Sequence, residues 1–209
     1  MPRKVVQGPI RDKEKTKQKL LAAVGKILKT RGYPGLKVSK IAAVAGFDKK
    51  LIYEYFGSTE KLIDEYIKTQ DYWSKMNDGN IEVDISDGGK ALSKMAILNQ
   101  FEYVKRNKEL QKIILWGLSE SKPILKKVAD EREAIGETLF SNIIDPYLKD
   151  KSTRYRAIAA LLVSGSYYLN LYTGHNASKF CGIDLKTDEG RKEIQKAIEE
   201  IIDFAYEEK

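Results

Sequence analysis

Apolar residues recur at every third or fourth position along most of the chain, which is the spacing of amphipathic helices. The first such stripe predicts a helix from about Asp12 to Arg31, ended by Gly32. Its inward face would consist of Leu20, Leu21, Val24, Ile27 and Leu28. One alternating stretch, residues 81–85, stands alone, and we find no convincing strand. The pattern therefore predicts an all-α protein.

The segment from Val38 to Gly57 has the pattern of a helix-turn-helix. A first short helix holds Ala42, the turn is Ala45-Gly46-Phe47, and a second helix runs from Lys49 to Phe56 after Asp48 as N-cap. Ala42 is small where two helices cross closely, and Gly46 tolerates a left-handed backbone. The apolar contacts between the two helices are expected from Ile41, Phe47, Ile52 and Tyr55.

Longer helical stripes follow this motif. A fourth helix, capped by Ser58 or Thr59, would run to about Met76, and the turn-rich stretch of residues 77–89 is expected to be a loop. Further helices are predicted at residues 90–105, 109–117, 123–144, 152–173 and 188–206. We place the domain boundary after residue 58. This gives a three-helix head, residues 1–58 with a basic arm at 1–11, and a larger helical-bundle body, residues 59–209.

The basic excess of the chain lies entirely in the segment that holds the helix-turn-helix. Residues 1–60 carry 14 Lys and Arg against 5 Asp and Glu, and the remainder carries 23 against 25, which together give the net charge of +7. Attraction to DNA phosphates requires such a footprint. Charge and motif together predict that the head binds double-stranded DNA.

Composition narrows the classes of protein to which the chain could belong. The 209 residues are 42% hydrophobic and 32% charged, as in an ordinary globular protein. Single Cys and His residues, Cys181 and His175, exclude a disulfide framework and a His-rich metal site. With no signal-peptide pattern and no apolar run of membrane-spanning length, we expect a cytoplasmic protein without membrane contact. No catalytic constellation or Gly-rich phosphate loop is visible, so we expect no enzyme and no cofactor.

The motif resembles that of the TetR family of bacterial one-component regulators. The resemblance covers roughly residues 12–66 and rests on Gly32-Tyr33, Ile41-Ala42, Ala45-Gly46, Tyr53, Phe56 and Leu62. Members have a three-helix DNA-binding head, a linking fourth helix and a variable helical body that binds a small ligand and dimerises. The resemblance implies that architecture here, and beyond residue 66 it is one of length and helix count.

Eight residues of the head and of the start of the fourth helix are candidate DNA contacts: Lys37, Ser39, Lys40, Lys49, Lys50, Tyr53, Glu54 and Thr59. Lys49 and Lys50 either read guanine edges or hold phosphates. Tyr53 resembles the family tyrosine that contacts the DNA backbone, and Glu54 lies at a frequent contact position. Thr59 replaces a family lysine that grips phosphate, but the amides of that helix end can bind a phosphate oxygen. Arg3 and Lys4 either reach a minor groove or remain a solvated terminus.

Aromatic residues spread over the body are candidates for a small-molecule pocket, and they are equally compatible with ordinary core positions. The candidate ligand residues are Tyr103, Trp116, Phe140, Tyr167 and Tyr168. By the resemblance the body binds an effector, which these residues would make apolar or aromatic. No cluster of basic residues in the body marks a site for a phosphorylated effector. A redox role for Cys181 has little support, since no second cysteine could resolve it.

The last two long helices carry wide apolar faces. By the family resemblance they would form a four-helix interface in a homodimer, unless both are used within one chain. The candidate interface residues are Ile158, Leu161, Leu162, Gly165, Leu169, Ile194, Ile198, Ile201 and Ile202.

The sequence thus predicts a ligand-responsive transcriptional regulator, most simply a repressor that leaves a palindromic operator when it binds its effector. Two heads in successive major grooves, about 34 Å apart, would require that palindrome. An activator or an effector-independent regulator would have the same head. A helical protein-interaction module without DNA binding is the more distant alternative.

Overall fold

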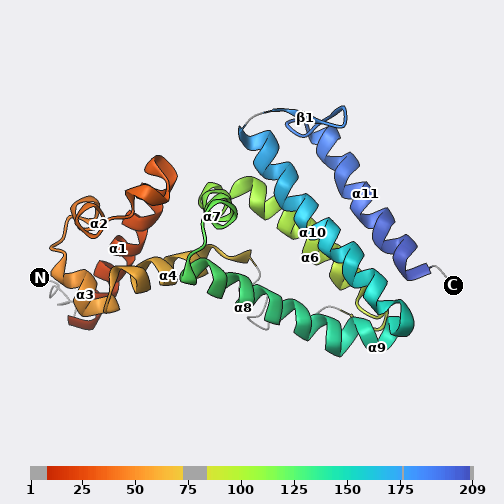
Figure 1. The fold of residues 1–209 in the computed structure, drawn as a ribbon, viewed down its shortest axis with the longest axis horizontal. Helices are drawn as coiled ribbons and strands as arrows, with labels where there is room; N and C mark the ends of the chain where they lie inside the picture. The colour runs from red at the N-terminus through yellow and green to blue at the C-terminus, as the bar shows by residue number, and fades with distance from the viewer. Residues whose placement is uncertain (1–8, 73–83, 176, 208–209) are drawn as a thin grey trace, which may run out of the picture. The chain divides into compact units, whose positions relative to one another are not determined.

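A computed structural model of the chain describes residues 9–72, 84–175 and 177–207. These residues are overwhelmingly helical, as the periodicity predicts (Figure 1). They divide into two compact units, residues 1–71 with 112–126 and residues 72–111 with 127–209. The unit that contains the helix-turn-helix therefore also includes the fourth helix and a segment from the middle of the chain. The domain boundary after residue 58 stays a prediction.

The first unit is built around helix α1, Pro9–Arg31, which packs against α2, Val38–Ala45, and α4, Thr59–Gln70. Helix α3, Lys50–Phe56, packs against α4. The predicted stripe of α1 is buried throughout, with Leu20 and Val24 fully enclosed. Two helix ends differ from the prediction. Helix α1 starts at Pro9, a residue favoured in a first helical turn, and α4 ends at Gln70, before Asp71 with its extended backbone.

In the second unit, α6, Lys90–Arg106, lies beside α10, Ser152–His175, and α11, Asp188–Glu207 (Figure 1). Their shared core contains Ile97, Tyr155 and Ile202, each at most 4% exposed. Helices α7, Lys108–Ser119, and α8, Pro123–Leu139, each contribute residues to both units.

The helix predicted at residues 123–144 is interrupted. Helix α8 ends at Leu139, a π-helical segment spans Phe140–Ile144, and the short helix α9, Asp145–Leu148, follows. The Arg156 guanidinium bridges this segment, donating to Glu137 Oε2 at 2.6 Å and to Asp145 Oδ2 at 2.6 Å. It also lies 4.6 Å from the centre of the Phe140 ring. Apolar spacing alone does not distinguish a π-helical turn from an α-helical one.

The expectation of no strand is wrong at one small hairpin. Strands β1, Lys179–Phe180, and β2, Ile183–Asp184, pair in antiparallel fashion between α10 and α11. Cys181 and Gly182 form the turn with φ of 49° and 81°. Two-residue strands are too short to leave an alternating pattern in the sequence.

None of the helices in the described part of the chain has both the length and the apolar character needed to cross a membrane. Of the predicted loop at residues 77–89, the described part, residues 84–89, consists of irregular backbone and turns; the rest lies outside the described residues.

Candidate functional site

The helix-turn-helix forms as the sequence predicts. Gly46 adopts the left-handed conformation, with φ of 75°, and ends α2. The Phe47 amide donates to the Ala42 carbonyl at 3.0 Å, which closes the turn. Ile41 and Ile52 are fully buried, α2 packs against α1, and α3 packs against α4. The two helices are therefore held in place by core packing rather than by the exposed side chains.

Asp48 caps the second helix. Its Oδ1 accepts from the Lys50 amide at 2.8 Å, so it satisfies one of the free amides at the start of α3. The helix is assigned from Lys50, one residue later than predicted, although Lys49 already has helical torsions. A difference of one residue at a helix end is ordinary fraying.

Most of the candidate DNA contacts are exposed on this unit. The exposed residues are Lys37, Ser39, Lys49, Lys50, Tyr53 and Glu54, and the half-buried ones are Lys40 and Thr59. Tyr53 is 49% exposed, whereas Phe56 on the same helix is 7% exposed. Helix α3 therefore presents a tyrosine, two lysines and a glutamate outward, on a helix of the size that enters a major groove.

A lysine that the sequence reading missed lies at the start of α4. Ser58 caps this helix by accepting from the Lys61 amide at 3.1 Å. The Lys61 side chain runs beside Gly57, where an added Cβ would lie 3.7 Å from Lys61 Nζ. Lys61 thus supplies a cation at this helix start, next to Thr59. Lys61 could have been predicted from the sequence, because it lies in the first turn of the predicted fourth helix.

Three lysines of α1 lie over aromatic rings of the motif. Lys13 lies 5.2 Å from the Tyr55 ring centre, Lys17 lies 5.8 Å from Phe56, and Lys19 lies 5.6 Å from Phe47. These contacts bring part of the basic excess of α1 to the helix-turn-helix. Tyr55 is half-buried, in keeping with a packing role. Arg3 and Lys4 lie outside the described residues.

Trp116 belongs to the same unit as the helix-turn-helix, and its predicted role in ligand binding stays a prediction. Its ring stacks on Tyr33, with centres 5.1 Å apart and planes 2° from parallel. A hydrogen bond between the Tyr33 hydroxyl and the Glu120 carboxylate raises the pKa of Tyr33 and lowers the pKa of Glu120. The segment 112–126 is therefore attached to the turn after α1 by one aromatic stack and one hydrogen bond.

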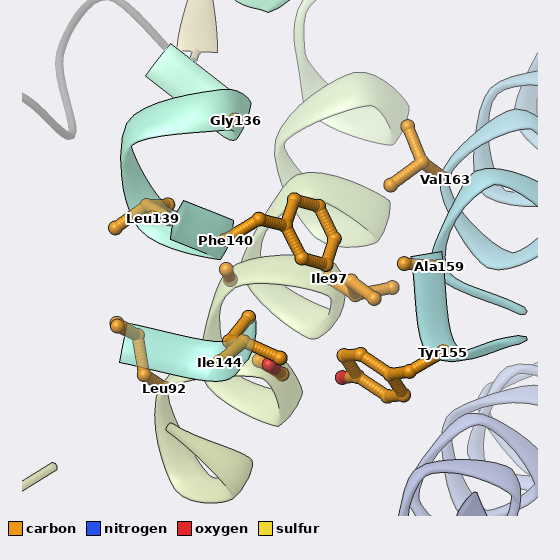
Figure 2. Close-up of a pocket in the computed structure, with 11 residues that line it drawn as sticks. Leu92, Ile97, Gly136, Leu139, Phe140, Ile144, Tyr155, Ala159 and Val163 are labelled. Atoms are coloured by element: carbon orange, nitrogen blue, oxygen red, sulfur yellow. The ribbon is translucent and has the colours of Figure 1, made fainter. Parts of the chain in front are cut away.

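An apolar pocket of about 70 Å³ lies in the second unit between α6, α8 and α10 (Figure 2). Its lining consists of Leu92, Ser93, Ala96, Ile97, Gly136, Leu139, Phe140, Ile144, Tyr155, Ala159 and Val163. Figure 2 shows the Phe140 ring projecting from the π-helical segment toward Val163 and Ile97. The lining is almost free of polar atoms, so the pocket favours an apolar group.

Of the five predicted ligand aromatics, Phe140 alone lines this pocket. Tyr103 pairs with Tyr72, the ring centres 5.5 Å apart, and Tyr167 lies near the same Tyr72. Burial raises the pKa of Tyr72 to about 12. Tyr168 is 53% exposed and stacks on Tyr172. The five aromatics are therefore not all brought to one pocket, because helical spacing does not specify which face meets which neighbour.

Tyr155 places a buried hydroxyl at the apolar pocket. It is 2% exposed, and within the described residues its hydroxyl makes no hydrogen bond of good geometry, although the Ser93 and Tyr206 hydroxyls lie near it. Burial raises the pKa of Tyr155, so the group is a neutral donor at physiological pH. Figure 2 shows the oxygen on the side of the ring that faces Ile144. An unpaired buried hydroxyl is costly and can be satisfied by a polar atom of a ligand.

The candidate interface residues of α10 and α11 separate into three groups by burial. Ile198 and Ile202 are 5% and 0% exposed and belong to the core of the second unit, so their place in an interface stays a prediction. Ile158, Leu162 and Ile194 are partly buried against that core, and Gly165 and Leu169 are half-buried. Leu161 is 73% exposed and Ile201 is 41% exposed. The sequence reading missed Phe204, which is 57% exposed on the outer face of α11.

Within the described residues, no group of three or more His, Cys, Asp or Glu side chains gathers as metal ligands. Cys181 is exposed at the hairpin turn.

Comparison with known proteins gives consistent matches. The family model for bacterial regulatory proteins of the tetR family matches residues 20–66. The HTH-type transcriptional repressor NicS of Pseudomonas putida is 22% identical over 179 residues, which cover 82% of this chain and 83% of NicS.

One solved structure shares the fold, and a second matches less well. A Clostridium perfringens chain described as a candidate regulator of fatty acid metabolism matches with a TM-score of 0.59 and 19% identity, over 88% of this chain and 97% of its own. A candidate TetR-family regulator from Mesorhizobium loti matches with a TM-score of 0.42 and 15% identity, over 92% and 96%.

Proposed function

Because this chain belongs to the TetR family of bacterial regulatory proteins, we propose that it is a homodimeric transcriptional repressor released from a palindromic operator by a small-molecule effector. The observation that carries the proposal is the outward face of α3, which exposes Lys49, Lys50 and Tyr53 on a well-packed helix-turn-helix. The similar protein NicS is named a repressor, which supports the sign of regulation. A catalytic function is not part of the proposal.

The DNA contacts divide by chemistry. Lys49, Lys50 and Glu54 lie on the exposed part of α3 and are the candidates for base edges, with lysine suited to guanine and glutamate to a cytosine amino group. Tyr53 is the candidate for the DNA backbone. The remaining contacts would be phosphate contacts from Lys37, Ser39, Lys40 and Thr59, together with Lys61. Phosphate contacts set position, and base contacts set sequence.

The homodimer would form through α10 and α11. Leu161, Gly165 and Tyr168 follow one another at helical spacing along α10, and Ile201 and Phe204 do so on α11. We name these five residues the apolar stripe. A side chain added at Gly165 would meet no atom within 4 Å, so this part of α10 is open to a close neighbour. Large exposed apolar groups at this density are typical of an oligomer interface.

The effector would enter the apolar pocket. The pocket of about 70 Å³ is smaller than the ~150 Å³ known to hold benzene, so an effector larger than a few carbon atoms must widen it. The π-helical segment lines it through Phe140 and Ile144, and such segments occur frequently at functional sites. Tyr155 would donate to one polar atom of the effector. The expected ligand is thus a small apolar molecule with one acceptor.

The first experiment measures binding of the purified protein to DNA upstream of its own gene across a salt series, with random DNA as control. Tight binding to the upstream fragment alone, with log affinity falling linearly with log salt, is expected of a specific regulator. Equal weak binding to both fragments would contradict the repressor proposal at this locus. It would favour a protein-interaction role.

The effector proposal has its own matched variants. Ala159 lines the apolar pocket, and its neighbour Ala160 is exposed. Ala159→Phe should fill the pocket, leave operator binding in place and abolish release by any compound found in a panel of small apolar acids and aromatics. Ala160→Phe should keep the release. An unchanged response of Ala159→Phe would place the effector elsewhere.

A further inference from the structure

A second pocket in the same unit differs from the apolar pocket in both size and chemistry. It measures about 280 Å³, against about 70 Å³ for the apolar pocket. It lies where the end of α6, the start of α7, the end of α10 and the segment leading into α11 meet. Its basic lining residues are Lys105, Lys108, Lys186 and Arg191, and we call it the basic pocket.

The sequence gives no sign of this site. We expected no cluster of basic residues in the body, and that expectation is wrong. Lys105 and Lys108 come from the α6–α7 junction, whereas Lys186 and Arg191 lie about eighty residues later at the entry to α11. Only the packing of α6 against α10 and α11 brings the four cations to one cavity.

The charges in this pocket are only partly compensated. Arg191 is 4% exposed and is held by Glu102, with Nη2 to Oε1 at 2.7 Å. Among the residues that the structure describes, no acidic side chain lines the cavity. Lys108 Nζ donates to the Gln111 side-chain oxygen at 3.3 Å, and within the described residues the ammonium groups of Lys105 and Lys186 have no partner. Three lysines at one cavity without an acid repel one another unless an anion joins them.

The polar floor of the pocket is rigid. Gln111 is 2% exposed, and its amide donates to the Val104 carbonyl at 2.7 Å. Asn170 is 4% exposed, donates to the Phe101 carbonyl at 2.9 Å and accepts from Arg191 Nη1 at 3.2 Å. Side chains locked in this way lose little entropy when a ligand binds. The floor is therefore preorganised, and the lysines above it supply the charge.

A simpler account is that these lysines only complement the carboxyl ends of α6 and α10, where a cation is favourable by about 0.3–1 kcal/mol. That account requires no cavity. It also leaves unexplained why Lys186, from a different segment, lines the same space.

We propose that the basic pocket binds a compact anion that carries at least two negative charges on phosphate or carboxylate oxygens. Lys105, Lys108 and Lys186 would contact the anion, and Arg191 would act as a positioning residue. This site is separate from the apolar pocket, and the proposal does not depend on DNA binding or on the effector. Because four segments meet there, occupancy would tie the end of α10 to the start of α11 and stabilise the second unit.

The test uses the full chain and two probes, pyrophosphate and citrate, at ionic strength held constant with chloride. Thermal unfolding and titration calorimetry should show saturable binding of at least one probe. The double variant Lys105→Gln with Lys186→Gln should bind that probe at least about tenfold more weakly, a loss of about 1.4 kcal/mol. The variant with Arg at both positions should retain binding, since it keeps the charges.

The matched control is Lys126→Gln with Lys192→Gln, which removes the same charge at exposed positions outside the pocket. It should bind the probe like the unmodified protein. Absence of saturable binding for both probes would overturn the proposal. An equal loss in the control variant would overturn it as well, because the effect would then be one of net charge. The measurement involves no DNA, so its failure is distinct from failure of the repressor proposal.

Discussion

Helix α3 and the helix pair α10–α11 both expose large side chains, but of opposite kinds. Helix α3 presents Lys49, Lys50 and Tyr53 to solvent, each with a charge or a hydroxyl at its tip. The pair α10–α11 presents Leu161, at 73% exposed, and Phe204, at 57% exposed, which have no polar atom in their side chains.

The difference indicates two kinds of partner. A polar outward face on a rigid helix keeps its hydration until it meets phosphates and base edges, and the resulting binding weakens with salt. An apolar outward face gains from leaving water altogether and depends little on salt. The proposed function assigns one surface to DNA and the other to a second copy of the chain, and the following substitutions test that contrast.

The largest effect is expected at α3. Lys49→Ala with Tyr53→Ala removes two contacts in each head and four in a dimer, at about 1 kcal/mol or more each. Operator affinity should therefore fall by about a thousandfold or more, measured by fluorescence anisotropy at fixed salt. Both side chains are exposed, so thermal stability and the dimer should persist. Unchanged operator affinity would remove these two residues from the interface.

The second largest effect is expected at the apolar stripe. Leu161→Glu with Phe204→Glu would bury carboxylates in the proposed interface, which costs several kcal/mol per pair of sites unless they are paired. Sedimentation at micromolar concentration should then show monomers. Lys192→Glu, which places a carboxylate at an exposed polar site of α11, should leave the dimer in place. A double variant that sediments as a dimer would move the interface elsewhere.

A smaller effect is expected from one methyl group at Gly165. Gly165→Ala should raise helix stability by up to about 1 kcal/mol while weakening the dimer, because a second helix would need the space. Melting temperatures measured across a dilution series separate the two effects.

Gly25 provides the contrast in the first unit. An added Cβ there would collide with the Tyr66 hydroxyl, so Gly25→Ala should destabilise that unit by about 1–3 kcal/mol at every concentration. If Gly165→Ala tightened the dimer, close approach of the α10 helices would be excluded.

The smallest effect is expected on stability, at the ion pairs that Arg156 forms within the chain. The Arg156 guanidinium lowers the pKa of Glu137 and the pKa of Asp145. A lowered carboxyl pKa adds stability above the unfolded value of about 4, and this stability is lost as pH falls through the folded value. The melting-temperature difference between the unmodified protein and Arg156→Met should therefore shrink below about pH 4. A difference that stays constant with pH would mean that Arg156 acts through packing alone.

Sequence alone specified the parts of the fold that rest on local rules. Ile41, Ile52 and Gly46 have the burial and the backbone conformation that the helix-turn-helix pattern predicts. Helical spacing did not predict burial where the apolar face of a helix is wide. Ile198 and Ile201 belong to one predicted face, and yet Ile198 is buried whereas Ile201 is exposed.

Features that depend on several segments could not be read from the chain. The apolar pocket requires α6, α8 and α10, and only Phe140 among its predicted aromatics lines it. The basic pocket contains lysines from segments that are distant in the sequence. Trp116 likewise stacks on Tyr33, which lies far from it in the sequence. Local periodicity carries no information on such pairings. It indicates which face of a helix is apolar, but not which other segment packs against that face.

The π-helical segment gives the chain a built-in extra residue. Glu137 before it and Asp145 after it both reach the same guanidinium of Arg156. Each residue of an α-helix turns the chain by about 100°, and the wider π-helical turn absorbs one extra residue without passing that rotation on. Deleting one residue from this stretch would therefore let α8 continue as an ordinary helix while Glu137 and Asp145 keep their places at Arg156. The wall of the apolar pocket would change instead, because Phe140 and Ile144 belong to the segment. Homologous chains that differ by a single residue here would thus share every helix and still differ in what they can bind.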